Sequence, residues 1–259
     1  MNASGTGAYS ATSSITAENL WITAAPLPNR QYFHISVAAN GKIYVFGGRD
    51  SDETFSSIWE YDPLSNFWAG KATTFDLNAT ELSYSRKAVE YEGKIYFAGG
   101  YDDPDFLSDF YVYDPASDTL TKKADLPVAA SCIGLGAADG KIYALGGQLV
   151  DGWSNAVYCY DIENDEWERF GDLPESMTFF NAFTKGGKIY LLEDYHFAGA
   201  CPIYVYDTAT GEFTLETHLP LDIHGTSFEN IGDNVYVFGG NDGTNSFESA
   251  YAYNLTGKT

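Results

Sequence analysis

Short segments rich in Ile, Val, Tyr and Phe recur along the chain, each bounded by glycine-containing turns. Residues 41–48 read Gly-Lys-Ile-Tyr-Val-Phe-Gly-Gly, and similar octets begin at Gly93, Gly140, Gly187 and Asp233. The successive starting points are 52, 47, 47 and 46 residues apart. Aromatic and β-branched residues favour strands, and a polar residue followed by glycine favours a two-residue hairpin turn. The pattern therefore predicts five repeated units, each with a turn leading into a short strand.

A second pair of residues keeps the same spacing. Its five copies are Tyr61-Asp62, Tyr113-Asp114, Tyr160-Asp161, Tyr206-Asp207 and Tyr253-Asn254. Seven residues after each of the first four tyrosines stands Trp68, Leu120, Trp167 or Phe213. The two markers together predict four strands in each unit. In the third unit these strands are residues 132–138, 141–145, 156–160 and 166–170. Four-stranded units with a period of about 50 residues are typical of propeller blades.

On these residues the chain resembles the kelch-repeat β-propeller family. The diglycine after the second strand, the Tyr-Asp of the third strand and the aromatic residue of the fourth follow the pattern of that family, over residues 20–259. The resemblance implies an all-β fold, a β-propeller of four-stranded kelch-like blades. Five repeats predict five blades.

The two ends of the chain indicate how the ring closes. Leu120, Trp167 and Phe213 each precede a Leu-Pro pair by six residues, and Trp21 precedes Leu27-Pro28 by the same interval. The last unit ends at Thr259, before its fourth strand. We therefore expect a propeller over residues 18–259, whose N-terminal strand near residues 20–23 completes the last blade, after a flexible leader or linker at 1–17. Two alternatives stay open: a fragment of a propeller with six or seven blades, or a strand donated to a neighbouring molecule.

Composition narrows the possible partners. The chain has 14 Lys+Arg against 36 Asp+Glu, a formal net charge of −22. Nucleic acids and anionic membranes both attract basic surfaces, so neither is an expected partner. The three cysteines, at positions 132, 159 and 201, lack the spacing of a disulfide framework or a metal site. We expect them to be buried as small apolar residues.

Acidic residues gather in the loops that join second to third strands. Calcium prefers oxygen ligands, so these loops are its candidate site, although no cofactor is otherwise expected. The alternative is an ordinary solvated acidic surface. The candidate metal ligands are Asp50, Asp52, Asp102, Asp103 and Asp242.

The loops from one blade to the next carry aromatic, basic and histidine side chains. Such residues anchor many binding surfaces. The same residues would also suit the start of a first strand or the lining of the channel. The candidates are Arg30, Tyr32, His34, Tyr84, Arg86, Phe179 and His224.

The fourth unit departs from the repeat. Glu193 and Asp194 replace the diglycine, and His196 follows. Glycines permit backbone conformations that side chains obstruct, so the turn must differ here. Either the repeat has decayed, or these three residues form a ligand or metal site.

These observations predict a binding module that presents loops to a protein or carbohydrate partner. One alternative is a structural subunit that assembles head to tail through its N-terminal strand. The other is a sugar-acting enzyme of the mutarotase or epimerase type, using Arg30, His34 and Arg86 in the channel. The sequence contains no nucleophile elbow or phosphate-binding glycine loop, so no catalytic residue is assigned. The leader, the scarcity of lysine and the acidity are similar to those of secreted or cell-surface propellers. We therefore expect an extracellular or cell-surface location.

Overall fold

The computed structural model describes residues 24–31, 34–52, 55–71, 87–102, 104–193, 201–219, 227–239 and 250–258. Within these ranges every regular element is a β-strand. No helix in this part of the chain has the length and apolar character needed to cross a membrane.

The strands form five sheets that follow one another along the chain. Blade 1 consists of β1 (Ile35–Ala39), β2 (Lys42–Phe46), β3 (Ile58–Asp62) and β4 (Phe67–Gly70). Blade 2 consists of β5 (Lys87–Tyr91), β6 (Lys94–Ala98), β9 (Phe110–Asp114) and β10 (Thr119–Lys122). Blade 3 consists of β11 (Gly134–Ala138), β12 (Lys141–Leu145), β15 (Ala156–Asp161) and β16 (Glu166–Asp172). Blade 4 consists of β17 (Phe179–Lys185), β18 (Lys188–Glu193), β19 (Pro202–Asp207) and β20 (Phe213–His218).

Blade 5 has three described strands, β21 (Ser227–Ile231), β22 (Asn234–Phe238) and β23 (Ala250–Asn254). Two small hairpins form the connections between the second and third strands of blades 2 and 3. They are β7 (Tyr101–Asp102) with β8 (Asp105–Phe106), and β13 (Gln148–Leu149) with β14 (Gly152–Trp153). The prediction of an all-β propeller with five blades is confirmed.

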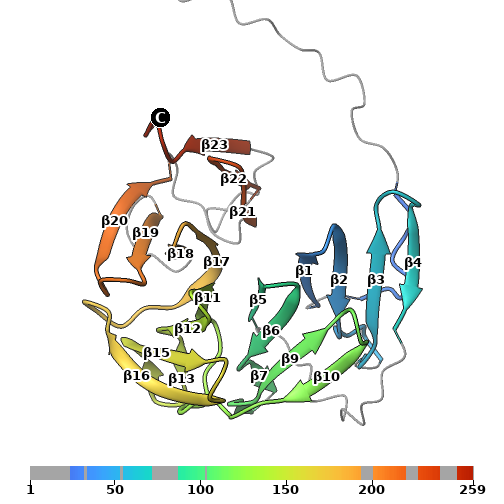
Figure 1. The fold of residues 1–259 in the computed structure, drawn as a ribbon, viewed down its shortest axis with the longest axis horizontal. Coiled ribbons are helices and arrows are strands. Elements are labelled where there is room, and N and C mark those ends of the chain that lie inside the picture. Colours follow the sequence, from blue (N-terminus) through green and yellow to red (C-terminus); the bar gives the residue numbers. More distant parts are fainter. Residues whose placement is uncertain are drawn as a thin grey trace, which may run out of the picture.

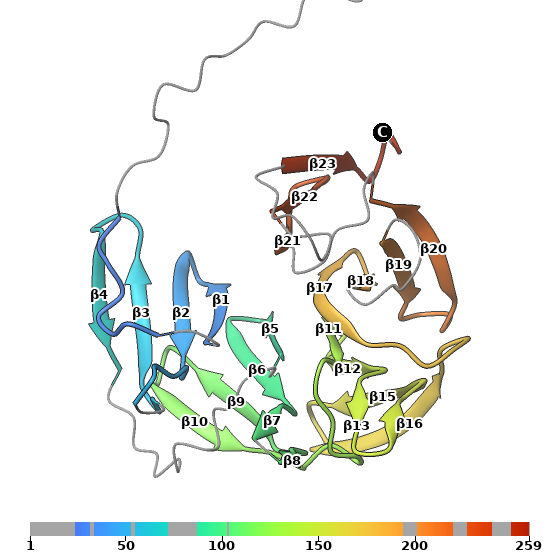
Figure 2. The ribbon, with the colours of Figure 1, turned by 180° about the vertical axis from the view of Figure 1, so that it is seen from behind.

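The first strand of every blade lies innermost. Figures 1 and 2, taken from opposite sides, both show β1, β5, β11, β17 and β21 around the centre. Each of these strands packs beside the first strand of the next blade, from β1 through to β21. The blades therefore radiate from a common centre that the first strands surround.

Strand register defines two faces of the propeller. Ile35, at the start of β1, pairs with Phe46, at the end of β2. The segment between blades and the loop from second to third strand therefore share one face, which we call the loop face. The hairpin turns, such as Asn40-Gly41, lie on the opposite face, the turn face. Both residues of that turn have positive φ, 52° and 74°, as expected for a two-residue hairpin.

The repeat residues make the contacts between blades. The second glycine of the diglycine donates to the segment leading into the next blade, from Gly100 N to Ala130 O and from Gly147 N to Met177 O, both at 2.8 Å. A Cβ atom on Gly99 would lie 2.3 Å from Ala130 O, which is too close for any side chain. The diglycine therefore lets two backbones approach each other.

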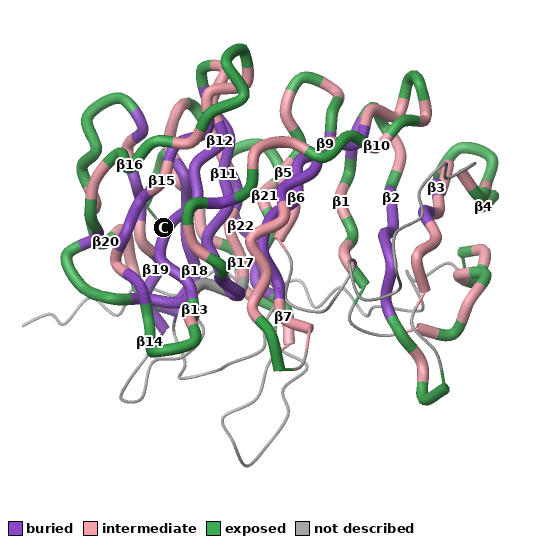
Figure 3. Tube along the Cα trace, turned by 90° about the horizontal axis from the view of Figure 1, so that it is seen from below, coloured by how far each residue is buried: buried purple, intermediate pink, exposed green. Residues whose placement is uncertain are grey.

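Four apolar clusters fill the junctions between successive blades. The third-strand tyrosine packs against the preceding blade, as Tyr160 does on Phe110 with ring centroids 4.7 Å apart. Tyr113 similarly meets Phe46 edge-on at 5.5 Å. The purple strands of Figure 3 show this buried core along the middle of the blades. The repeat thus encodes packing between blades more than packing within one.

Blades 1 and 5, at the two ends of the series, are less well buried than the blades between them. Core positions in their second strands are exposed to solvent. Ile43 in β2 is 38% exposed, although its counterparts Ile95, Ile142 and Ile189 are 0% exposed. In β22, Phe238 is 48% exposed, whereas Phe46 at the same place in blade 1 is 1% exposed. The closing strand expected near residues 20–23 and the leader at 1–17 lie outside the described residues. Closure of the ring therefore stays a prediction.

Three strand ends in the third blade differ from the sequence-based prediction. Two strands are longer than predicted, because β15 continues to Asp161 instead of residue 160 and β16 continues to Asp172 instead of residue 170. The first strand was expected to begin at Cys132, but β11 begins at Gly134. Cys132 has φ of +50°, a left-handed conformation that interrupts an extended strand. All three cysteines are buried and unbridged, as predicted.

Candidate binding site at the channel mouth

A cavity of about 210 Å³ lies where the five first strands begin. Every blade contributes to its lining, because each first strand starts at the loop face beside the channel. Its polar side chains are His34, Ser36, Lys87, Asn181 and Glu229. Apolar residues such as Leu135 and Phe228 separate them.

The electrostatics of this cavity depend on partial burial. Burial raises the pKa of Glu229 above its usual value, because desolvation disfavours the carboxylate. Burial lowers the pKa of His34, because it disfavours the imidazolium. Both side chains still reach solvent. The cavity thus combines a cation on Lys87, a carboxyl group, an imidazole and neutral polar groups, and it suits a polar ligand group.

The structure brings only some of the predicted binding residues to this site. His34 lines the cavity. Arg30 is exposed and is not part of the lining. Phe179 opens β17 and pairs with Glu193, and its side chain lies outside the described part. The other four candidates of this group also lie outside the described residues; they are Tyr32, Tyr84, Arg86 and His224.

Glu193 continues the second strand of blade 4 where the other blades turn at a diglycine. It is the last residue of β18, and its side chain is buried. A bulge in β17 between Phe179 and Asn181 accommodates the longer pairing. Asp194 and His196 lie outside the described residues, so the predicted three-residue site stays untested.

The predicted calcium ligands do not form a site among the residues that the structure describes. Within those ranges no group of three or more His, Cys, Asp or Glu side chains could hold a metal ion. Asp50 instead accepts a hydrogen bond from the backbone N of Asp52 at 2.7 Å. Asp102 pairs with Asp105 in the β7–β8 hairpin. Asp103 and Asp242 lie outside the described part of the chain.

Four cavity residues are not among the predicted binding residues: Ser36, Lys87, Asn181 and Glu229. The repeat itself holds a signal for two of them. Lys87 and Asn181 each stand six residues before the glycine that begins the next octet, Gly93 or Gly187. Aligning the five octets on their first residue would have placed both residues at the start of a first strand. Glu229 had no such signal, because the corresponding residues Val37 and Phe183 are apolar.

The architecture and the central cavity define a five-bladed β-propeller of four-stranded blades. The Kelch motif matches residues 33–69, 83–127, 129–174 and 224–259, which together make up more than half of the chain. The chain belongs to the kelch-repeat family. The matched ranges omit all four strands of blade 4, where Glu193 and Asp194 replace the diglycine.

Curated relatives and a solved structure agree with this assignment. The chain is 27% identical to Kelch-like protein 15 of Danio rerio over 147 residues, 47% of this chain and 23% of that protein. It is 26% identical to Kelch-like protein 35 of Mus musculus over 164 residues, 47% of this chain and 28% of that protein. The chain thus spans less than a third of either relative. The structure of YjhT is similar in fold, with a TM-score of 0.69 and 14% identity over 89% of this chain and 83% of that one. Family membership supports a protein-interaction module.

Proposed function

We propose that the propeller is a binding module for another protein, which docks on the loop face over the channel mouth. The supporting observation is the convergence of all five first strands on one polar cavity at that face. A partner that covers the mouth would contact every blade at once. Polar groups that line a cavity give orientation and specificity to such a contact.

The charge of the chain favours a cationic partner. The formal net charge is −22, and acidic residues such as Asp52 and Asp151 lie exposed in the loops of this face. Complementary charge raises the association rate more than it raises affinity, and salt weakens it. We expect association with the partner to slow as ionic strength rises.

Photocrosslinking tests the proposed face. Benzoylphenylalanine is placed at His34 or Asp52 on the loop face, and at Ala116 in a hairpin turn on the turn face as the matched control. The proposal predicts a discrete protein adduct at His34 and Asp52, in an extract of the organism that encodes the chain, and none at Ala116. Equal adducts at all three positions, or adducts at Ala116 alone, would overturn it.

A second candidate is binding or turnover of a carbohydrate in the channel. It rests on the presence of Glu229 and His34 in one cavity, since burial shifts their pKa values toward the neutral forms. A carboxyl group and an imidazole are both side chains that enzymes use as general acid or base. Anomer interconversion of free reducing monosaccharides, followed by NMR, would be accelerated by the protein and slowed by Glu229→Gln. An unchanged rate with the native protein excludes this function for those sugars.

An extracellular or cell-surface location also stays a proposal, supported by the acidity and the scarcity of lysine. Protease treatment of intact cells tests it: an exposed propeller becomes accessible to degradation, whereas an internal one is protected until the cells are lysed.

A further inference from the structure

A second cavity, of about 400 Å³, lies between blades 2 and 3 on the loop face. The β7–β8 hairpin forms one wall through Tyr101 and Phe106, and the β13–β14 hairpin forms the other through Leu149 and Val150. Figure 3 shows β7 and the β13–β14 hairpin on the same edge of the ring, opposite the exposed hairpin turns. The volume is within the range of pockets that bind ligands.

Backbone hydrogen bonds fix the separation of the two hairpins. The segment leading into blade 3 lies between them. Its Ala130 accepts from Gly100 N at 2.8 Å and donates to Leu107 O at 3.0 Å. The next residue, Ser131, exchanges two bonds with Gln148, at 3.0 and 2.8 Å. Both walls are therefore tied to one segment, and the cavity is formed before any ligand arrives.

The lining combines the apolar or aromatic side chains of Tyr101, Phe106, Leu149 and Val150 with the polar side chains of Ser131 and Gln148. One of the apolar side chains lies where solvent normally selects a polar one. Val150 is 86% exposed at the tip of its hairpin. Trp153 does not line the cavity, but it pairs with the lining residue Gln148 across the same hairpin and is 41% exposed. Tyr101 and Phe106 meet edge-on with ring centroids 5.0 Å apart. Exposed apolar side chains gathered around a preformed cavity are typical of a recognition site.

The charged residues of the two hairpins and of the segment between them are all acidic. Asp102, Asp105 and Asp151 belong to the two hairpins, and Asp103 lies between the first two in the sequence. Residues 99–108, 129–133 and 147–154 contain no Lys or Arg. An apolar side chain that enters the cavity therefore brings its neighbours into a negative field, which favours Lys and Arg.

We propose that this cavity binds an extended segment of a partner protein, in which one large apolar residue is flanked by Lys or Arg. The proposal rests on the proposed protein-binding function and locates a specificity pocket within it. The apolar side chain fills the space between Tyr101, Phe106 and Val150. The flanking cations lie beside the aspartates at the hairpin tips.

A peptide array tests the specificity. Its nonapeptides carry Leu, Met, Phe or Ala at the centre, flanked by Lys-Arg pairs, and a matched set replaces these pairs with Glu-Glu. We expect retention of the basic peptides with Leu, Met or Phe, and weak retention of the basic Ala peptide and of every acidic peptide. Retention of basic peptides irrespective of the central residue would overturn the proposal, because charge alone would then explain binding.

Two variants locate the binding site. Val150→Asn should lower the affinity for the basic peptide with central Leu about tenfold, because it removes an apolar side chain from the cavity wall. The fold should be unaffected, because Val150 is exposed. Leu64→Asn is the matched control, since Leu64 is 98% exposed in a hairpin turn on the turn face. Asp105→Asn with Asp151→Asn should weaken binding at low salt and reduce its salt dependence, with Glu163→Gln on the turn face as the control. Equal effects of a variant and its control would overturn the proposal.

The two proposals fail in different ways. Crosslinks at His34 without selective peptide binding would reject this cavity and keep the protein-binding function. Peptide binding that is lost in Val150→Asn, without crosslinks at His34 or Asp52, would keep the cavity and reject docking over the channel mouth.

Discussion

The indole Nε1 of Trp167 donates a 2.9 Å hydrogen bond to the backbone oxygen of Ala124, which lies between blades 2 and 3. The backbone N of Ala124 in turn donates to the carboxylate of Asp165 at 3.0 Å. Both backbone groups of one inter-blade residue are thus held by blade 3. Blade 1 repeats this arrangement on Ala25, through Trp68 Nε1 and the amide oxygen of Asn66.

Asp165→Ala should lower the free energy of unfolding by about 1–2 kcal/mol, because Ala124 N and Tyr160 OH lose their acceptor. Asp165→Asn should cost less than half as much, since Asn66 accepts the equivalent two bonds in blade 1. Urea unfolding of the two variants measures the difference. Equal losses would show that charge, through the ion pair with Lys123, outweighs the hydrogen bonds.

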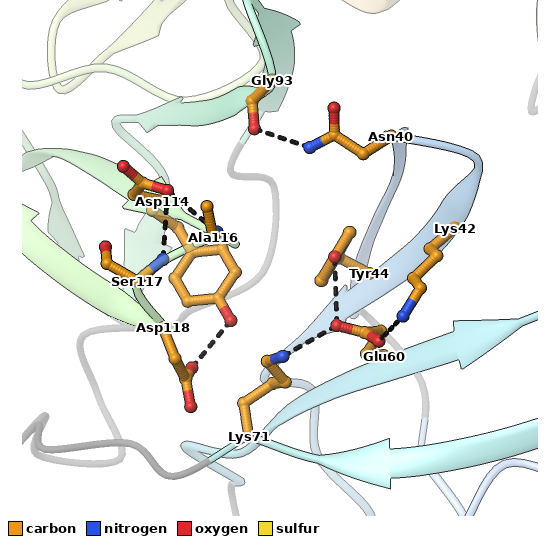
Figure 4. Close-up of polar contacts among 11 residues, drawn as sticks. Asn40, Lys42, Tyr44, Glu60, Lys71, Gly93, Asp114, Ala116, Ser117 and Asp118 are labelled. Carbon is orange, nitrogen blue, oxygen red and sulfur yellow. Dashed lines mark hydrogen bonds and ion pairs between the residues drawn. The ribbon is translucent and has the colours of Figure 1, made fainter.

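The polar contacts of Glu60 predict that the protein loses stability in acid. Burial by itself would raise its pKa, but hydrogen bonds from Lys42, Lys71 and Tyr44 outweigh burial and lower the pKa to about 2 (Figure 4). A folded-state pKa below the unfolded value of 4.5 means stability that is present above pH 4.5 and is lost as the pH falls toward 2. We expect the free energy of unfolding to decline across this window.

Glu60→Gln should flatten that decline and destabilise the protein at pH 7 by about 3 kcal/mol, since each unit of the pKa difference corresponds to about 1.4 kcal/mol. Guanidinium unfolding at a series of pH values measures both effects. Glu163→Gln, at an exposed turn position, is the matched control and should follow the native curve. A Glu60→Gln curve parallel to the native one would contradict the prediction.

Gly136 and Ile189 predict where an added methyl group is not tolerated. A Cβ atom on Gly136 in β11 would lie 2.6 Å from two side-chain carbons of Ile189, which is fully buried between blades 3 and 4. Gly136→Ala should therefore cost about 1–3 kcal/mol. Gly171→Ala meets nothing within 4 Å and should change stability by less than about 0.5 kcal/mol.

Thermal unfolding distinguishes the two glycine variants, with a fall in Tm for Gly136→Ala alone. Ile189→Ala removes the side-chain carbons that would clash, so adding Gly136→Ala to an Ile189→Ala variant should recover part of the loss that Gly136→Ala causes in the native chain. No recovery would place the strain in the backbone of β11 instead.

The repeat explains how much of the fold could be predicted. Tyr61 and Trp68 stand seven residues apart and are direct cross-strand partners, as are Tyr160 and Trp167. Such pairs follow from local spacing and a short turn. The polar cluster of Glu60 does not, because its partner Lys71 approaches from beyond β4 and Val112 occupies the corresponding place in blade 2.

The candidate sites were harder to predict than the fold, because their residues do not follow the spacing of the repeat. His34 was found from residue type alone, whereas Glu229 stands where other blades carry apolar residues and becomes a cavity residue only through the ring. The cavity beside Val150 joins hairpins from two blades, tied by contacts of Ala130 and Ser131 that no sequence spacing encodes.

Among the described residues β23 pairs only with β22, and its other edge is where the predicted closing strand can be tested. Tyr61, Tyr113, Tyr160 and Tyr206 each pair with the residue seven positions later in the fourth strand. If residues 20–23 complete blade 5, Tyr253 has Trp21 as its partner and Ala252 has Ile22. Closure would bring blades 5 and 1 together. The side chains of Ile43 in blade 1 and Phe238 in blade 5, which are exposed in the structure, would then be covered. We therefore expect the pair Ile22→Cys and Ala252→Cys to form a disulfide within one chain.

Non-reducing electrophoresis and intact mass distinguish the three possible closures in this double variant. A disulfide within the chain, accompanied by a higher Tm than in the reduced form, supports closure by the chain's own N-terminal strand. A disulfide between chains supports donation of that strand to a neighbour, and two free thiols contradict both arrangements and favour further blades. Ile22→Cys alone is the control, because the natural Cys132, Cys159 and Cys201 are buried and cannot readily exchange with it.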